Sequence, residues 1–105
     1  MKFALLVNAA PQSAEAAASA LAFARAALER GHEVLRVFFY FDGALNADRL
    51  AAPPAAERNL GREWSALAAE RGIDLVVCIT AGQRRGVREA NLAPGFRALM
   101  ERRYA

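Results

Sequence analysis

The sequence predicts a small α/β domain, built as a doubly wound parallel sheet with helices on both faces. Short apolar runs rich in β-branched and aromatic residues alternate with longer stretches in which apolar residues recur at helical spacing. Strands that alternate with helices in this way favour a parallel sheet joined by right-handed crossovers. The chain has 105 residues, enough for one modest core, so we expect a single domain over residues 1–105.

The first strand and the first helix are predicted near the N-terminus. Residues 3–7 form a short apolar run that ends at Asn8, before a loop that contains Pro11. Ser13 is a candidate N-cap for the helix that follows, and Gly31 is its stop signal. The apolar positions of this helix recur at helical spacing: Ala17, Leu21, Ala24 and Leu28. The alanines indicate close packing on the sheet.

The second strand is predicted over Val34 to Phe41, which is rich in β-branched and aromatic residues, with a turn starting at Asp42-Gly43. Pro53-Pro54 then excludes helix locally. Helical spacing resumes at Ala55 and stops at Gly72. Four apolar residues form one stripe on this second helix: Leu60, Trp64, Leu67 and Ala68.

The third strand is predicted over Leu75 to Ile79. This run is continuously apolar and lies between Gly72 and Gly82, which is typical of a strand buried on both faces. Ligands and chemistry in parallel sheets collect at the carboxyl ends of the strands. That rule predicts one group of residues near a single edge of the sheet: Asn8, Tyr40, Asp42, Cys78 and Thr80.

The C-terminal part is predicted to close with a helix, and whether the sheet has its last strand stays open. Pro94 is acceptable near the first turn of such a helix. The residues at helical spacing are Phe96, Leu99, Met100 and either Arg103 or Tyr104.

Composition and charge narrow the function classes. The hydrophobic fraction is 55%, inflated by alanine, and no apolar run approaches the roughly 20 residues that span a bilayer. No signal-peptide pattern follows Met1, so we expect a cytoplasmic protein with no membrane partner. The net charge of +3 is mild, and its arginines are spread over several elements, which favours solvated faces over direct nucleic-acid binding.

Cys78 is the chain's only cysteine and stands at the end of an apolar strand. It cannot form an internal disulfide, which agrees with a reducing compartment. Burial statistics favour a core role, because free cysteine packs as a small hydrophobe. The adjacent cations Arg84 and Arg85 indicate the opposite, since nearby positive charge favours the reactive thiolate. Inert core and reactive thiol therefore both stay open.

Three blocks of the sequence resemble the DsrE/TusD family of sulfur-relay proteins. They are residues 1–7, with Lys-Phe-Ala-Leu-Leu-Val; residues 31–46, with Gly-His-Glu, Val-Phe-Phe-Tyr and Asp-Gly-Ala-Leu-Asn-Ala; and the Cys78 block with its Gln-Arg-Arg-Gly turn. Their order and spacing match up to about residue 87. Beyond it, Ala90-Asn91-Leu92 and Gly95-Phe96 match the family pattern, whereas the family's last strand has no counterpart.

The resemblance implies a flavodoxin-like, DsrE-like fold and a sulfurtransferase. In that family the cysteine of this block carries sulfur as a persulfide, which assigns the carrier role to Cys78. Five further residues are expected to tune the thiolate or bind substrate: Arg84, Arg85, Thr80, Tyr40 and Asp42. The implied partners are paralogous subunits in a heterohexamer, a sulfur donor protein and an acceptor protein, and no cofactor is implied. Two pathways stay open, tRNA 2-thiouridine synthesis and dissimilatory sulfur oxidation.

Two other functions compete with this one. Cys78 and Arg84 also fit Cys-x5-Arg, the anion-binding loop of phosphatases and arsenate reductases. Against that fit, Arg85 stands where Ser or Thr usually follows, and the chain contains no Asp-Pro general acid. The second competitor is a non-catalytic structural subunit of a hetero-oligomer. His32 has no second histidine or further cysteine beside it, which gives a metal site little support.

Overall fold

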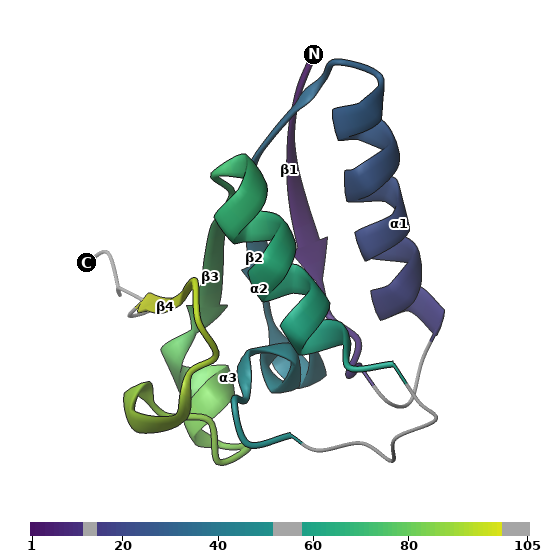
Figure 1. Cartoon of the computed structure of the whole chain (residues 1–105). Coiled ribbons are helices and arrows are strands. Elements are labelled where there is room, and N and C mark those ends of the chain that lie inside the picture. The colour runs from purple at the N-terminus through teal and green to yellow at the C-terminus, as the bar shows by residue number, and fades with distance from the viewer. Residues whose placement is uncertain (12–14, 52–57, 100–105) are drawn as a thin grey trace, which may run out of the picture.

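The computed structural model describes residues 1–11, 15–51 and 58–99 (Figure 1). The predictions for Ser13, Pro53-Pro54 and Ala55 lie outside these ranges. Along the described chain the elements follow in this order: β1 (Lys2–Val7), α1 (Glu15–Glu29), β2 (Glu33–Phe39), the 3-10 helix η1 (Phe41–Ala47), α2 (Leu60–Arg71), β3 (Asp74–Cys78), α3 (Ile79–Gln83), the 3-10 helix η2 (Glu89–Asn91) and β4 (Phe96–Leu99).

The strands form one parallel sheet in the spatial order β1-β2-β3-β4, which confirms the predicted α/β class. The helix predicted from Phe96 onward is wrong over the described residues, because Phe96 to Leu99 pair with Leu75 to Cys78 as strand β4. Two apolar residues three apart fit one helical turn, but they also fit a short strand. Gly95, at φ +87°, turns the chain onto the sheet edge before this strand.

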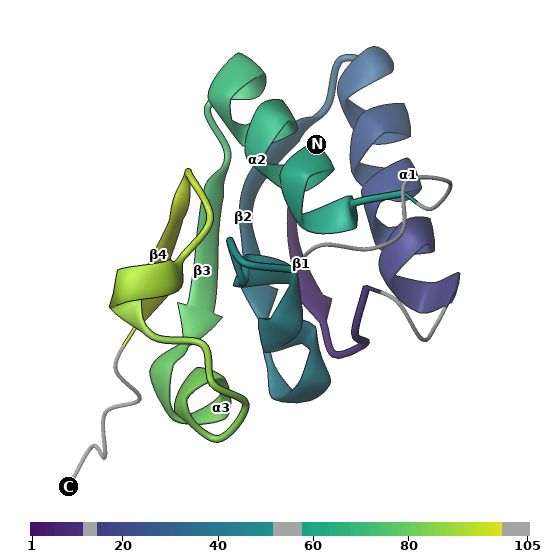
Figure 2. The same ribbon diagram turned by 60° about the horizontal axis from the view of Figure 1, so that its bottom comes forward.

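Helices α1 and α2 lie side by side over the same face of the sheet (Figures 1 and 2). Arg25 of α1 forms an ion pair with Glu63 of α2 at 3.2 Å. Because the strand order follows the chain, crossovers of one hand bring each connecting helix back over one face. The structure thus has the predicted parallel sheet and its helices, but α1 and α2 do not divide between the two faces.

The core lies between this face and the two helices. The predicted stripes of α1 and α2 are buried there, from Ala17 to Leu28 and from Leu60 to Ala68. The rings of Phe39 and Trp64 meet edge to face with centroids 5.5 Å apart, and Phe96 of β4 packs 5.0 Å from Phe39. The sheet residues and helix stripes therefore share one hydrophobic cluster.

Glycine and asparagine set the ends of the two helices. The chain after α1 turns at Gly31, with φ +86°, and α2 ends at Gly72, with φ +71°. The start of α2 is later than predicted from Ala55. Asn59 is its N-cap, and the Asn59 side chain accepts the backbone N–H of Arg62 at 3.1 Å. This side-chain cap fixes the first turn at Leu60.

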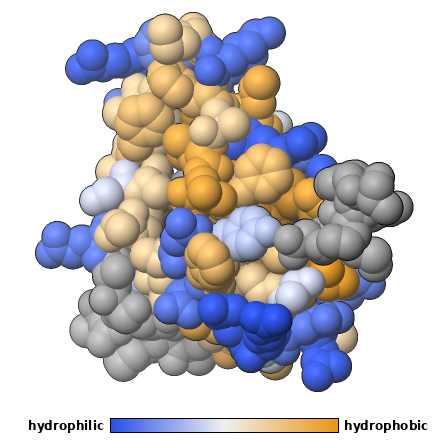
Figure 3. Space-filling view, turned by 180° about the vertical axis from the view of Figure 1, so that it is seen from behind, coloured by the Kyte–Doolittle hydropathy of each residue, from blue (hydrophilic) through white to orange (hydrophobic). Residues whose placement is uncertain are grey.

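The opposite face of the sheet carries both apolar and charged side chains. By strand alternation Leu6 and Leu99 lie on it and are exposed, and Figure 3 shows the orange hydrophobic atoms that gather on this side. Within the described ranges, no helix is long and apolar enough to cross a membrane.

A charge cluster lies at the amino end of β3. Arg36 of β2 donates to the Asp74 carboxylate at 2.8 Å, and Arg97 of β4 donates to both of its oxygens at 2.9 Å. The hydrogen bond from Arg97 is the main cause that lowers the pKa of Asp74 below its ordinary value of 3.8; Arg36 adds to the effect and partial burial opposes it. The cluster joins three adjacent strands at their surface.

A second paired carboxylate joins the helices. Arg58 donates to both oxygens of Glu63, at 2.7 and 3.0 Å, in addition to the Arg25 contact. The Arg58 hydrogen bond is the main cause that lowers the pKa of Glu63, with burial opposing it. Glu63 thus holds α1 and the chain before α2 together.

Candidate functional site

Cys78 is the last residue of β3 and lies at the carboxyl edge of the sheet. Phe39 of β2 is in register with Val77, and Tyr40 and Cys78, the residues that follow these two, lie at the same edge of the sheet. Cys78 is 8% exposed and belongs to the hydrophobic cluster. The sequence predicted this position correctly. The sulfur atom belongs to a largely covered residue, however, so a reacting group must approach it closely from one side.

The turn after Cys78 is the short helix α3, with Cys78 at its N-cap position in extended conformation. The carbonyl of Gly82 accepts the N–H of Val87 at 2.7 Å, which folds the chain back after the helix. A Cβ atom on Gly82 would lie 2.9 Å from the Val87 carbonyl oxygen, so a larger residue would push this turn apart. Thr80 is exposed on α3, and its carbonyl accepts the N–H of Arg84 at 3.2 Å.

The 3-10 helix η1 forms the other wall of the site. The N–H of Tyr40 donates to the Val7 carbonyl at 3.0 Å, and the N–H of Gly43 donates to the Tyr40 carbonyl at 2.7 Å. A Cβ atom on Gly43 would overlap the Val7 carbonyl oxygen, so only glycine allows η1 to pack on the end of β1. The Asp-Gly turn that the sequence predicts is therefore a close backbone contact.

Arg85 connects the two walls. Its Nε donates to the Asp42 carboxylate of η1 at 3.0 Å, and its Nη1 donates to the Ala81 carbonyl of α3 at 2.9 Å. Arg84, by contrast, is exposed and has no ion pair with any residue that the structure describes. The sequence predicted the same role for these two adjacent arginines, but the structure gives them different surroundings.

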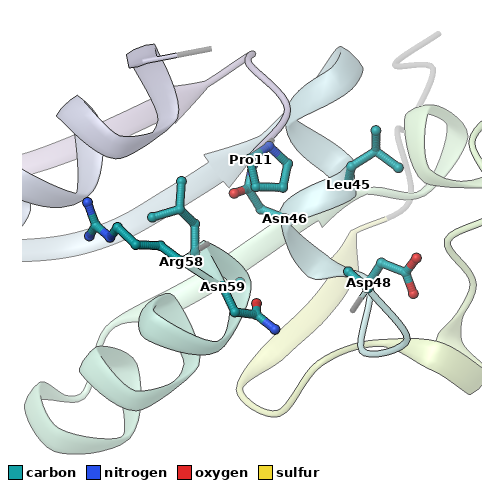
Figure 4. Close-up of a pocket in the computed structure, with 9 residues that line it drawn as sticks. Pro11, Leu45, Asn46, Asp48, Arg58 and Asn59 are labelled. Atoms are coloured by element: carbon teal, nitrogen blue, oxygen red, sulfur yellow. The ribbon is translucent and has the colours of Figure 1, made fainter. Parts of the chain in front are cut away.

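Asn46 is a buried polar residue of η1 that the sequence reasoning missed. It is 1% exposed, and its Nδ2 donates to the carbonyls of Gly43 at 2.9 Å and Ala9 at 3.1 Å. Its Oδ1 accepts no hydrogen bond from the described residues. Beside it lies a cavity of about 10 Å³, enough for about one water molecule (Figure 4). The available signal was an asparagine inside the otherwise apolar run from Ala44 to Ala47.

The segment between α3 and β4 supports η1 from its far side. Asn91 accepts the N–H of Arg88 at 2.8 Å and donates to the Asp48 carboxylate at 2.9 Å. The N–H of Ala93 then donates to the Ala47 carbonyl at 2.8 Å. The Ala90-Asn91-Leu92 segment, which matches the family pattern, is thus a structural brace for η1.

The structure brings together most of the residues predicted to surround the thiol. Tyr40 lies at the same sheet edge as Cys78, and Asp42 is joined to the turn after Cys78 through Arg85. Thr80 and Arg84 lie exposed on that turn. This arrangement can present one sulfur atom at the sheet edge, followed by a turn that carries two arginines, to a second thiol.

The geometry gives less support to the anion-binding loop of a phosphatase. In that loop the residues between cysteine and arginine wrap around an oxyanion with their backbone amides. Here residues 79–83 form helix α3 directly after Cys78, and Arg85, not Arg84, is the arginine fixed to the neighbouring wall. The described residues also contain no group of three His, Cys, Asp or Glu side chains suited to a metal ion.

Comparison with known proteins places this geometry in a family. The model of the DsrE/DsrF-like family matches residues 1–101. A DsrE protein of Allochromatium vinosum, named as a sulfurtransferase, is 51% identical over 87 residues, which are 83% of this chain and 67% of that protein. The sulfurtransferase TusD of Klebsiella pneumoniae is 45% identical over 107 residues, covering 91% of this chain and 84% of its own length.

A solved structure shows the same fold. The crystal structure of the ychN protein from E. coli superposes with a TM-score of 0.81, covering 95% of this chain and 85% of that one at 20% sequence identity. A TusD sulfurtransferase of Yersinia pestis is 40% identical over 107 residues, covering 91% of this chain and 82% of its own length. The chain therefore belongs to the DsrE/DsrF-like family, in which relatives at 40 to 51% identity are named sulfurtransferases.

Proposed function

We propose that this protein is a sulfurtransferase subunit of a cytoplasmic sulfur relay and that Cys78 carries the sulfur as a persulfide. The observation that supports this most is the position of Cys78 at the carboxyl edge of the sheet, between η1 and α3, in a chain whose relatives are named sulfurtransferases. The class of enzyme follows from the family. The carrier residue and its chemistry are the proposal.

The chemistry needs no outside oxidant or reductant. The Cys78 thiolate attacks the outer sulfur of a donor persulfide, a new sulfur–sulfur bond forms on Cys78, and the donor's own sulfur–sulfur bond breaks. The electron pair of that bond leaves with the donor sulfur, which takes up a proton as a thiol. The second half-reaction is the reverse: an acceptor thiolate attacks the outer sulfur of the Cys78 persulfide, the sulfur–sulfur bond on Cys78 breaks, and Cys78 leaves as a thiolate.

The surrounding residues have distinct proposed roles. Arg84 is the exposed cation that stabilises the thiolate and the leaving thiolate, since positive charge favours both. Arg85 and Asp42 act together to hold α3 against η1. Tyr40 follows the neighbouring strand β2 at the edge where Cys78 ends β3, and Thr80 lies exposed on α3, where an incoming group can contact it.

Mass spectrometry after incubation with polysulfide tests the carrier role. The wild-type protein should gain roughly 32 Da, one sulfur atom, on the Cys78 peptide, and dithiothreitol should remove it. Cys78→Ser should take up no sulfur, because the hydroxyl is a poor nucleophile of nearly the same volume. If Cys78→Ser folds with native stability and the wild-type protein stays unmodified under the same conditions, Cys78 is not the carrier.

A structural subunit is the second candidate, favoured by the burial of Cys78 at 8% exposure. Dithionitrobenzoate separates the two functions, because an inert core thiol reacts only after unfolding. Labelling of native Cys78 within minutes supports the carrier. Labelling only in denaturant supports the structural subunit.

Assembly with paralogous subunits of the same fold is part of the proposal. The exposed apolar residues Leu6, Leu35 and Leu99 give this small domain more apolar surface than a monomer needs. Sedimentation of the protein with its co-expressed paralogues should show a hetero-oligomer, with a hexamer expected. A stable monomer at micromolar concentration, alone and in the mixture, would contradict this part.

A further inference from the structure

Phe41 combines two properties that folding alone does not favour. Its φ is +48°, the only positive value for a residue other than glycine in the described ranges, and it is 58% exposed. A bulky aromatic residue is an outlier in that backbone region, where glycine or asparagine fits better. Its exposed ring also contributes little to the core. Both properties indicate that the ring has a role outside the fold.

The backbone around Phe41 explains how the conformation is imposed. Tyr40 is extended, and its N–H is fixed to the Val7 carbonyl. Two residues after Phe41, Gly43 packs against the same carbonyl oxygen. The chain must therefore turn within Phe41 itself. Strain held by its surroundings in this way is typical of functional positions.

The ring of Phe41 also lies at the proposed site. Its centroid is 5.3 Å from that of Tyr40, which lies at the same sheet edge as Cys78. The next residue, Asp42, forms the ion pair with Arg85 that joins η1 to α3. An exposed apolar ring thus lies on the element that packs against the turn after Cys78, and Arg84 lies on that turn.

We infer that Phe41, supported by the Tyr40 ring, is the docking anchor for the protein that exchanges sulfur with Cys78. This inference rests on the proposed carrier function of Cys78. The sulfur of an 8% exposed residue can meet a partner sulfur only in a narrow range of approach, so orientation matters for the rate. Exposed aromatic side chains are frequent anchors of protein contacts. Phe41 therefore selects partners that carry an apolar side chain next to their reactive cysteine.

Two short persulfide peptides test this preference directly. One is acetyl-Leu-Cys-Leu-amide and the other acetyl-Gly-Cys-Gly-amide, each carrying a persulfide on its cysteine, with inorganic polysulfide as a third donor. The wild-type protein should load Cys78 about fivefold faster from the leucine peptide than from the glycine peptide, the ratio that corresponds to the free energy of one aromatic contact. The rate should be followed as the gain of sulfur on Cys78.

Phe41→Asn is the decisive variant, because asparagine tolerates the left-handed backbone while the ring is removed. It should be at least as stable as wild type, load normally from polysulfide and lose the preference for the leucine peptide. Phe41→Tyr should restore that preference. Phe23→Ala, which removes a partly exposed ring on α1 that packs against Phe3, is the matched control and should keep both the loading rate and the peptide preference of wild type.

The outcomes separate the two claims. If Phe41→Asn keeps the fivefold preference of wild type, or if wild type has none, Phe41 is not the anchor although Cys78 still loads. If wild type loads from none of the three donors, the carrier function of Cys78 fails and the anchor fails with it.

Discussion

The two ends of strand β3 use arginine in opposite ways. At the amino end, Arg36 and Arg97 converge on the Asp74 carboxylate, so that both arginines are held in ion pairs. At the carboxyl end, Arg85 is engaged by Asp42, whereas Arg84 is exposed and has no ion pair within the described chain. The difference teaches that the charges around Asp74 are structural, while the exposed Arg84, six residues after Cys78, is the cation that we propose acts on an incoming group.

The two ends also differ in packing. The charge cluster of Asp74 lies on the surface, and exposed ion pairs contribute little stability because water and salt screen them. The site around Cys78 depends on contacts between backbone atoms, such as Gly43 against Val7, which leave no room for a Cβ atom. Substitutions at the carboxyl end should therefore have larger effects than substitutions at the amino end.

The largest effect is expected for Gly43→Ala. The added Cβ would overlap the Val7 carbonyl oxygen, and backbone cannot move aside as a side chain can. The free energy of unfolding should fall by about 1–3 kcal/mol, the usual cost of overpacking, as measured by urea denaturation. Asn8→Ala, an exposed change beside Val7, is the control and should be nearly neutral. A neutral Gly43→Ala would show that the carboxyl end is not tightly packed.

A medium effect should distinguish the adjacent arginines. Arg85→Ala removes the link between η1 and α3 and should lower the free energy of unfolding by ~1 kcal/mol, since Asp42 is largely exposed. Arg84→Ala should leave stability unchanged and slow sulfur loading from polysulfide up to about fivefold, the rate change expected when one solvent-screened charge interaction is lost. The slowing should shrink in about 1 M salt. If the two variants changed the free energy of unfolding and the loading rate equally, Arg84 and Arg85 would not have different roles.

The smallest effect is expected at the amino end, for Asp74→Asn. The lowered pKa of Asp74 means that its ion pairs add stability above the ordinary carboxyl value of 3.8, and that this stability disappears as pH falls through the folded-state pKa. At neutral pH the free energy of unfolding of wild type should exceed that of the variant by less than ~1 kcal/mol. Below the ordinary carboxyl pKa the two free energies should converge.

Urea denaturation at several pH values measures this difference, with Glu70→Gln on the exposed surface of α2 as control. Asp74→Asn should load sulfur at the wild-type rate. A loading defect in Asp74→Asn would contradict the separation between the two ends of β3.

Much of the fold could be predicted because each signal was local. The buried stripe of α1 and the apolar run of β3 follow from periodicity alone, and the predicted parallel α/β class was confirmed. Strand β4 was missed because Phe96 and Leu99 are spaced as in a helix, and pairing with β3 decided between the two states. The one-sided placement of α1 and α2 depends on strand order, which local patterns do not contain.

The candidate site was predictable in position but not in detail. The rule on carboxyl strand ends brought Tyr40, Asp42 and Cys78 together correctly. The sequence could not tell that Arg85 is held by Asp42, because that contact joins residues 43 positions apart. The strained backbone of Phe41 likewise results from tertiary contacts of its neighbours.

A chase of labelled sulfur tests most directly that Cys78 is a carrier and not an end point. Wild-type protein is loaded on Cys78 with radioactive outer sulfur, freed of donor, and mixed with an excess of a cysteine peptide as acceptor. The account predicts that the label leaves Cys78 and appears on the peptide as persulfide, while protein whose persulfide was alkylated after loading yields no labelled peptide persulfide. Label that loads on Cys78 and stays there after the acceptor is added would contradict the relay.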